Sequence, residues 1–183
     1  QIYRDDGALE NFYTLEVETG TSLTVNHDIS VAGTLRMHGG DLSLGSRILT
    51  LGVNGSQTGT LDHVSGSLVG QMRRWVDPAT DNGREVLFPV GTSGYYRPIT
   101  LQFDNLTNSG TLTAHFEASD PGSSGMPLEE DGETLNNAFP EGYWPVTRAN
   151  GFSFSGSYDV RLVADGFSTF SIDTSNRVIV RTG

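Results

Sequence analysis

The amino-acid sequence predicts an all-β protein: a short three-sided parallel β-helix followed by an antiparallel β-sandwich. Three observations predict this fold class. Short apolar dyads, each with one polar residue between two apolar ones, recur at a period of about 20 residues in the first third of the chain. Glycines fall between the dyads, where tight corners are needed. The rest of the chain shows longer alternating segments and no helical period with caps.

The dyads define the predicted β-helix, residues 12–72. Two apolar residues around one polar residue are typical of a strand with one buried face. The first and fourth dyads begin 20 positions apart, the second and fifth 19, and the third and sixth 20. We therefore expect three strands per coil, paired in the same direction along three columns. The dyads are Leu15-x-Val17, Leu23-x-Val25, Ile29-x-Val31, Leu35-x-Met37, Leu42-x-Leu44 and Leu49-x-Leu51.

The period is interrupted on both sides of these dyads. Residues 52–59 predict an insertion at one corner of the last coil, after which the pattern resumes at Leu61, Val64 and Leu68. Residues 1–11 fit no coil, and we expect them to form a lead-in strand or a cap.

Residues 73–183 predict the β-sandwich, because eight candidate strands are separated by turn signals. The polar segment 119–142, rich in Pro and Gly, is expected to be a mobile loop with its acidic part in solvent. Trp75 and Trp144 lie in apolar strands and are expected in the sandwich core. The candidate strands are 73–77, 85–90, 95–103, 111–118, 143–148, 157–164, 168–173 and 177–181.

The amino-acid composition limits the classes of partner and the kinds of chemistry that the protein can have. The 22 acidic and 11 basic residues give a net charge of −11, which disfavours nucleic acid and anionic membrane surfaces. No segment is apolar for the roughly 18 consecutive residues of a membrane span. Cysteine is absent, and every basic residue is Arg, so disulfides and lysine-based covalent chemistry are excluded.

The order of motifs resembles a module of very large cell-surface proteins of Bacteroidota. The matching residues are Gly66 to Gly70, Arg73 and Arg74, Phe88 to Gly91, Tyr96 to Pro98, and Trp144. Proteins of this kind look like adhesins or surface fibres exported by a dedicated secretion system. The resemblance implies an extracellular, cell-surface location and supplies no catalytic residues.

The sequence contains two candidate ligand sites, and the residues of each could instead have a structural role. Asp77, Asp81, Asn82 and Glu85 supply hard oxygen donors of the kind that calcium prefers, although their spacing is not that of a standard calcium loop and such residues also form ordinary turns. Tyr95, at a Gly-flanked turn, is the aromatic ring most suited to stack on a glycan. No other cofactor is expected.

The remaining charged residues favour structural roles. Arg73, Arg74 and Arg97 are expected to pair with carboxylates. Glu16 and Glu18 share a strand face, but three coils are too few for a sugar-cleaving groove, and no nucleophile motif is present. We therefore expect that the protein is not an enzyme.

The sequence predicts a structural or adhesive module that joins copies of itself, or neighbouring modules, through the ends of its β-helix. Open strand edges invite pairing, and head-to-tail contacts give open filaments. The alternative is a carbohydrate-binding module that recognises surface glycans, and a third possibility is a small polysaccharide-active enzyme. The candidate interface residues are Gln1, Ile2, Tyr3 and Arg4, then Phe12, Leu15 and Val17, then Val178, Ile179, Val180 and Arg181.

Overall fold

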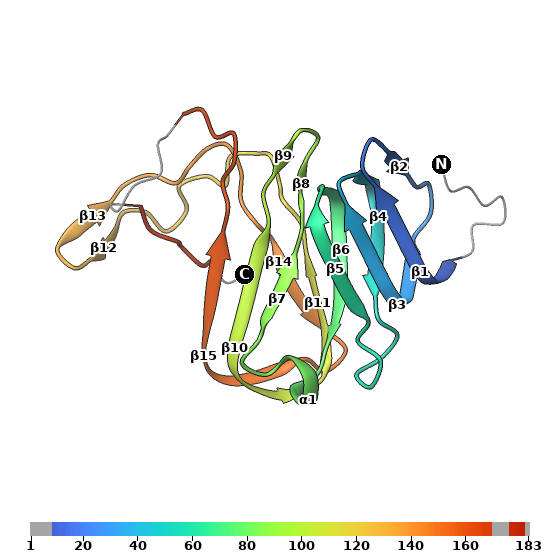
Figure 1. Cartoon of the computed structure of the whole chain (residues 1–183). Helices are drawn as coiled ribbons and strands as arrows, with labels where there is room; N and C mark the ends of the chain where they lie inside the picture. The colour runs from blue at the N-terminus through green and yellow to red at the C-terminus, as the bar shows by residue number, and fades with distance from the viewer. Residues whose placement is uncertain (1–8, 170–175, 182–183) are drawn as a thin grey trace.

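The computed structural model of the chain describes residues 9–169 and 176–181. A β-solenoid of about 3 turns leads into a pair of antiparallel sheets, as the sequence predicts (Figure 1). The solenoid strands are β1 (Glu10–Glu18), β2 (Ser22–Thr24), β3 (Ile29–His38), β4 (Asp41–Leu51), β5 (Thr60–Ser65) and the first part of β6 (Leu68–Val76).

The solenoid strands stack in the predicted columns. In the first column, Leu15 pairs with Leu35, which pairs with Leu61. The other two columns join Leu23 to Leu42 to Leu68, and Ile29 to Leu49 to Met72. All of these pairings are parallel, so the predicted coils are confirmed. The repeat of about 20 residues holds between the first and second coils, and the spacing to the third coil is longer.

The apolar residues of the dyads point into the solenoid, and all but the half-buried Leu23 are buried. Leu35, Met37, Leu42, Leu49 and Leu51 are 0% exposed. Burying a side chain of this size contributes about 1.5–3 kcal/mol, so these inward rows hold the coils together.

The insertion predicted at 52–59 is also confirmed. Leu35 pairs with Leu61, 26 positions later, instead of a residue 20 positions later. The assignment of Val64 to the inward row is wrong, because its side chain is 71% exposed. A register shift between Met37 and His38 changes which face the residues of β5 present at this point.

The sandwich follows the solenoid without a gap in the core. One sheet has the order β15–β10–β7, and the other contains β6, β11 and β14. Phe103, Leu112 and Phe152 belong to the same apolar cluster as Leu35 and Leu49 of the solenoid. The elements are α1 (Pro78–Asp81), β7 (Glu85–Phe88), β8 (Gly91–Thr92), β9 (Tyr95–Tyr96), β10 (Ile99–Asn108), β11 (Gly110–Ala114), β12 (Leu128–Glu130), β13 (Glu133–Leu135), β14 (Val146–Ala149) and β15 (Ser153–Leu162).

Strand β6 belongs to both parts of the molecule. It pairs in parallel with β4 on one side and antiparallel with β11 on the other, so the sheet β1–β3–β4–β6–β11–β14 is continuous. The predicted division at residues 72 and 73 falls inside this strand. The segment 88–91 adds a second connection, because Leu68 forms a parallel bridge to Val90.

The solenoid also decides which side of β6 faces the core. Met72 continues the buried row above Leu49, so Arg74 and Val76 point inward after it and are buried. The prediction that Trp75 lies in the core is wrong: it is half-buried and is outside the core cluster. Trp144 packs against the core, as predicted.

Three further predictions differ from the structure. The segment 119–142 contains a hairpin of β12 and β13, which projects from the sandwich (Figure 1). A four-residue helix, α1, follows β6. No strand forms at 177–181, and most of the candidate strand 168–173 lies outside the described residues. Within the described part of the chain, no helix has the length and apolarity needed to cross a lipid bilayer.

Candidate functional site

The two ends of the continuous sheet are the first candidate site. Strand β1 pairs with β3 and strand β14 pairs with β11, and neither outer edge is paired with another described strand. All four residues of β14 are exposed. An unpaired edge presents backbone N–H and C=O groups to any extended chain that can approach it.

The predicted interface residues of the first coil do not all lie on this edge. Leu15 and Val17 are 8% and 2% exposed and point into the solenoid, so they cannot form a surface contact. Phe12 is half-buried against the core, while its neighbour Tyr13 is 75% exposed. Gln1, Ile2, Tyr3 and Arg4 lie outside the described residues.

The C-terminal part of the predicted interface is exposed. Val178 and Val180 are 55% and 59% exposed, and Ile179 between them is half-buried. The Arg181 guanidinium donates to the carbonyls of Pro121 and Gly122 at 2.7 and 2.8 Å. The segment therefore exposes two apolar side chains, and it forms no strand within the described residues.

Strand β15 is a third edge, at the side of the sandwich. It pairs with β10 at eight positions, and no described strand pairs with its outer side. Exposed Asp159 and Arg161 lie on it, and its register to β10 shifts near Gly156. Charges and bulges of this kind are how natural sheets protect an edge from unwanted pairing.

The two aspartates of the predicted calcium loop accept hydrogen bonds from groups of the same loop. Asp77 is the N-cap of α1, and its side chain accepts from the Ala79 N–H at 2.8 Å. Asp81 accepts from the Asp77 N–H and from the Thr80 hydroxyl, both at 2.8 Å. These contacts hold the turn that follows β6.

The other two predicted calcium ligands face different partners. The Asn82 side-chain oxygen accepts from the Leu106 N–H at 2.7 Å. Glu85 forms an ion pair with Arg161 at 2.9 Å, which ties β7 to β15 across the sheet. Each predicted ligand therefore serves the fold, and the four oxygen donors are not directed at one point.

A different group of ligand-type side chains lies on the outside of the solenoid. Among the described residues, Glu16, Glu18 and His38 form the one group of three such side chains whose ligand atoms lie within 4.8 Å of one another. Arg36 lies 3.8 Å from Glu16 and 3.7 Å from Asp62 on the next coil. We interpret this cluster as a charge ladder across three coils, since Arg36 pairs with Glu16 and Asp62 while His38 lies 4.0 Å from Glu18.

The sequence predicts carboxylate partners for Arg73, Arg74 and Arg97, and this prediction is wrong within the described residues. Arg73 Nε donates to the Thr113 hydroxyl at 3.2 Å. Arg74 is 9% exposed and donates to the Leu87 carbonyl at 2.8 Å. Burial lowers the pKa of Arg74 to about 10, against an opposing effect of Asp81.

Arg97 is enclosed by aromatic rings at the junction of the hairpin β8–β9 with the last loops. Its guanidinium carbon lies 4.6 Å from the ring centre of Phe116, 4.7 Å from that of Phe167 and 5.0 Å from that of Tyr95. Its Nε donates to the Asp165 carbonyl at 2.8 Å, and its own carbonyl accepts from the Trp144 indole at 2.7 Å. Arg97 therefore joins three segments that are far apart in the sequence.

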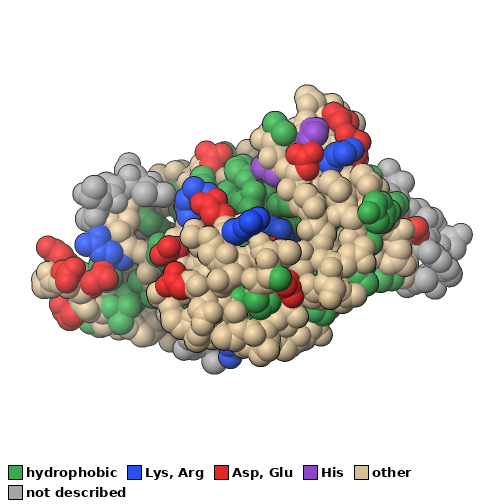
Figure 2. Space-filling view, turned by 60° about the horizontal axis from the view of Figure 1, so that its bottom comes forward, with side chains coloured by type: hydrophobic (Ala, Val, Ile, Leu, Met, Phe, Trp, Pro, Cys, Tyr) green, Lys and Arg blue, Asp and Glu red, His purple; other side chains and the backbone are tan. Residues whose placement is uncertain are grey.

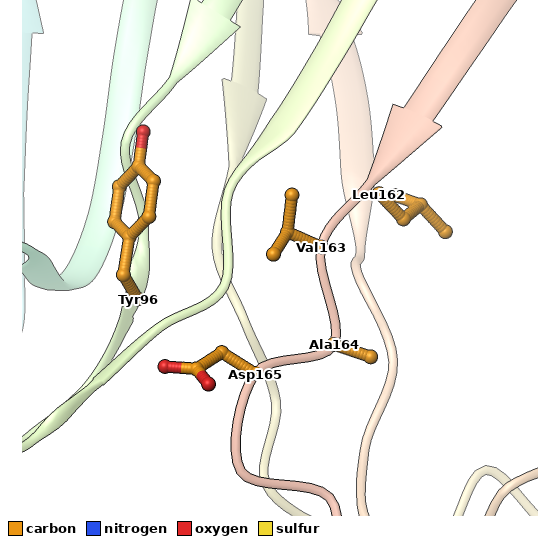
Figure 3. A pocket seen from close by; sticks show the side chains of 5 residues that line it. All are labelled: Tyr96, Leu162, Val163, Ala164 and Asp165. Carbon is orange, nitrogen blue, oxygen red and sulfur yellow. The ribbon is translucent and has the colours of Figure 1, made fainter. Parts of the chain in front are cut away.

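The predicted glycan residue, Tyr95, is part of this cluster. Its ring is 45% exposed and packs closely against Gly166, where an added Cβ would meet a ring carbon at 2.0 Å. Its neighbour Tyr96 stacks on His63 of β5, with ring centres 5.2 Å apart, and burial raises the pKa of Tyr96. Figure 3 shows the shallow pocket beside it, with Tyr96 facing Val163 and Asp165 across the gap.

Glu141 anchors the last described loop to the sandwich. Its carboxylate accepts from the Ser168 N–H at 2.8 Å and from Thr169. The hydrogen bonds to Thr169 and Ser168 lower the pKa of Glu141 below its usual 4.5. A carboxyl whose pKa is lower in the folded state stabilises the fold above its unfolded pKa. That stabilisation is lost as the pH falls through the lower, folded value.

We therefore expect the wild-type protein to lose more thermal stability between pH 5 and about pH 3 than a Glu141→Gln variant, which has no proton to bind. Thermal unfolding followed by circular dichroism at a series of pH values measures this difference. Identical pH profiles for the two proteins would show that the Glu141 contacts do not hold the loop.

The surface outside these clusters carries mixed charge. Figure 2 shows basic side chains next to acidic ones on the face in view, and not in a separate basic patch. Comparison with protein families, curated proteins and solved structures gives no significant match to this chain.

Proposed function

We propose that this protein is a non-catalytic structural module of an extracellular, cell-surface fibre or adhesin. The observation that carries the proposal is the continuous sheet β1–β3–β4–β6–β11–β14, which ends in an edge strand at each side. It joins the solenoid to the sandwich by backbone hydrogen bonds, without a linker. The resemblance of the sequence to surface proteins of Bacteroidota supports the same proposal.

The proposed mechanism is the transmission of load through backbone hydrogen bonds. Six strands at a spacing of about 4.8 Å extend the ladder over roughly 24 Å. In the solenoid the bonds of all three columns run along the same axis, so a force on one coil is shared by several bonds on the next. The apolar interior is continuous across the junction, which prevents the two parts from moving independently.

Copies or neighbouring modules would be joined by strand pairing at the open edges. The edges of β1 and β14 lie at the two ends of one sheet, so a contact between unlike ends would give an open filament. Residues 178–181 supply two exposed valines, Val178 and Val180, in a segment that could be donated to such an edge. This segment has the alternation of a strand but no strand partner within the described residues.

We expect the purified protein to associate end to end as its concentration rises, and the double variant Val178→Asp/Val180→Asp to remain monomeric. A charge on each exposed valine should prevent the segment from pairing with an edge, while leaving the core unchanged. Electron microscopy and light scattering over a range of concentrations measure the assembly.

Val53→Asp is the matched control, since Val53 is also an exposed valine, at 50%, but lies in the 52–59 insertion. It should assemble like the wild type. Monodisperse wild-type monomers at high concentration, or equal assembly by the double variant, would contradict self-association through this segment.

Glycan binding at Tyr95 is a second proposal. Tyr95 is 45% exposed, and an exposed aromatic ring suits a stacking contact with a sugar. The other contacts of the ring, with Arg97 and Gly166, belong to the packing of the sandwich. The structural role accounts for most of what Tyr95 contacts.

A further inference from the structure

A polar pocket of about 420 Å³ lies on the outer side of the solenoid, close to its junction with the sandwich. Its walls include Thr50 of β4 and Arg73 of β6, which are register partners on neighbouring strands. Arg47, in the turn within β4, and His27 and Asp28, before β3, complete the polar lining. Two consecutive coils and the first strand of the sandwich sheet therefore build one site.

The charges of this pocket differ from those of the protein as a whole. It contains two guanidinium groups and one carboxylate, whereas the whole chain has a net charge of −11. Asp28 is already engaged, because its Oδ1 accepts from the Ile48 N–H at 3.0 Å. No ion pair joins Asp28 to either arginine within the described residues, so the positive charge of the pocket is not cancelled by its own walls.

The two arginines have unused donors. Arg47 is exposed, and within the described part of the chain its side chain makes no hydrogen bond or ion pair. Arg73 uses Nε to reach Thr113 at 3.2 Å, which fixes its stem and leaves the terminal nitrogens of the guanidinium without a described partner. A planar guanidinium with free donors is suited to bind a carboxylate through two parallel hydrogen bonds.

The other groups in the pocket fit the rest of a sugar ring. The Thr50 hydroxyl both donates and accepts, and the second oxygen of Asp28 can accept from a sugar hydroxyl. The volume lies within the range of about 300–1,000 Å³ that is typical of small-molecule sites. The high negative charge of the whole protein opposes densely charged polyanions, but not a single carboxylate on an otherwise neutral ring.

We propose that this pocket binds a uronic acid residue, with Arg47 and Arg73 on its carboxylate and with Thr50 and Asp28 on its hydroxyl groups. The site would give the module a chemical target on a polysaccharide that carries isolated uronic acid residues among neutral sugars, a property that goes beyond the proposed structural role. It does not depend on that role, because the described residues that line the pocket all belong to one copy of the chain.

The test is calorimetric titration of the full chain with D-glucuronate, D-glucose and sodium sulfate. We expect saturable binding of glucuronate and binding at least about tenfold weaker for the neutral sugar and for sulfate, since each lacks one half of the recognised chemistry. Backbone amide shifts measured by NMR should change at Asp28 and Ile48. These outcomes support the site even if the protein never forms filaments.

Variants separate this site from general attraction of anions. Arg47→Ala should weaken glucuronate binding at least about tenfold without loss of the folded state, since Arg47 is exposed and has no described contacts to lose. Arg84→Ala, another exposed arginine, should bind like the wild type. Absence of glucuronate binding, equal binding of sulfate, or equal loss in both variants would overturn the proposal.

Discussion

Replacing Arg97 by alanine is expected to lower the free energy of unfolding by about 3 kcal/mol, because the substitution removes a buried side chain enclosed by three rings. The guanidinium contacts Tyr95, Phe116 and Phe167, and its Nε satisfies the Asp165 carbonyl. For a chain of this size, such a loss corresponds to a fall of about 6–12 °C in the melting temperature. Thermal and urea unfolding measure it.

The control is Arg84→Ala, which removes an exposed arginine and should change stability by about 0.5 kcal/mol or less. Arg97→Lys keeps the charge but loses the planar group that stacks on the rings, so we expect only partial recovery. If Arg97→Ala were no more damaging than Arg84→Ala, the aromatic enclosure would not be a source of stability.

Replacing Gly66 by alanine is expected to cost about 2–5 kcal/mol, because two unfavourable effects coincide. The backbone of Gly66 has a φ of +96°, which side chains disfavour. An added Cβ would also lie 2.2 Å from the carbonyl oxygen of Gly40 on the neighbouring coil. The clash is with backbone, so it can be relieved only by separating two coils. Urea unfolding measures the loss.

Gly45→Ala provides a matched comparison within the same solenoid. Gly45 also has a positive φ, +56°, but an added Cβ there would have no neighbour within 4 Å. We expect a cost of about 1 kcal/mol from the backbone conformation alone. Equal losses in the two variants would mean that the approach of the coils at Gly66 contributes nothing.

The sequence was most informative where the structure repeats. The pairs Leu15 with Leu35, and Ile29 with Leu49, are found at the predicted register. A repeated strand buries the same face in each coil, so the periodicity is a direct record of the stacking. Where the repeat ended, local alternation was less reliable: Val178 and Val180 alternate like a strand but are exposed and form none.

The orientation of β6 shows why local patterns fail at a junction. The local pattern of apolar residues predicts that Trp75 faces the core, yet in the structure Arg74 has the buried position. Strand side chains alternate with a period of two, so the register of Met72 on Leu49 fixes every later residue of the strand. The burial of Arg74 is therefore set by the pairing of β6 with the preceding coil. It could not be deduced from the residues next to Arg74 in the sequence.

The candidate sites also differ in how far they could be predicted from the sequence. The acidic residues of the predicted calcium loop form a hydrogen-bonded turn and a cross-strand ion pair, because Asp and Asn suit both chemistries. The polar pocket escaped sequence analysis because its residues lie on two consecutive coils and on β6. Arg47 and Arg73 are 26 positions apart in the sequence and line one pocket only in the folded chain.

The sequence alone determined the fold class, the three columns of the solenoid and the place of its insertion, because periodic burial of apolar residues is encoded locally and then repeated. The tertiary structure decided the union of solenoid and sandwich through β6, the side of that strand that faces the core, and the convergence of Arg97 with its rings and of Arg47 with Arg73. These features depend on which distant segments become neighbours. That choice is made by register and packing across the whole chain, and no single segment contains it.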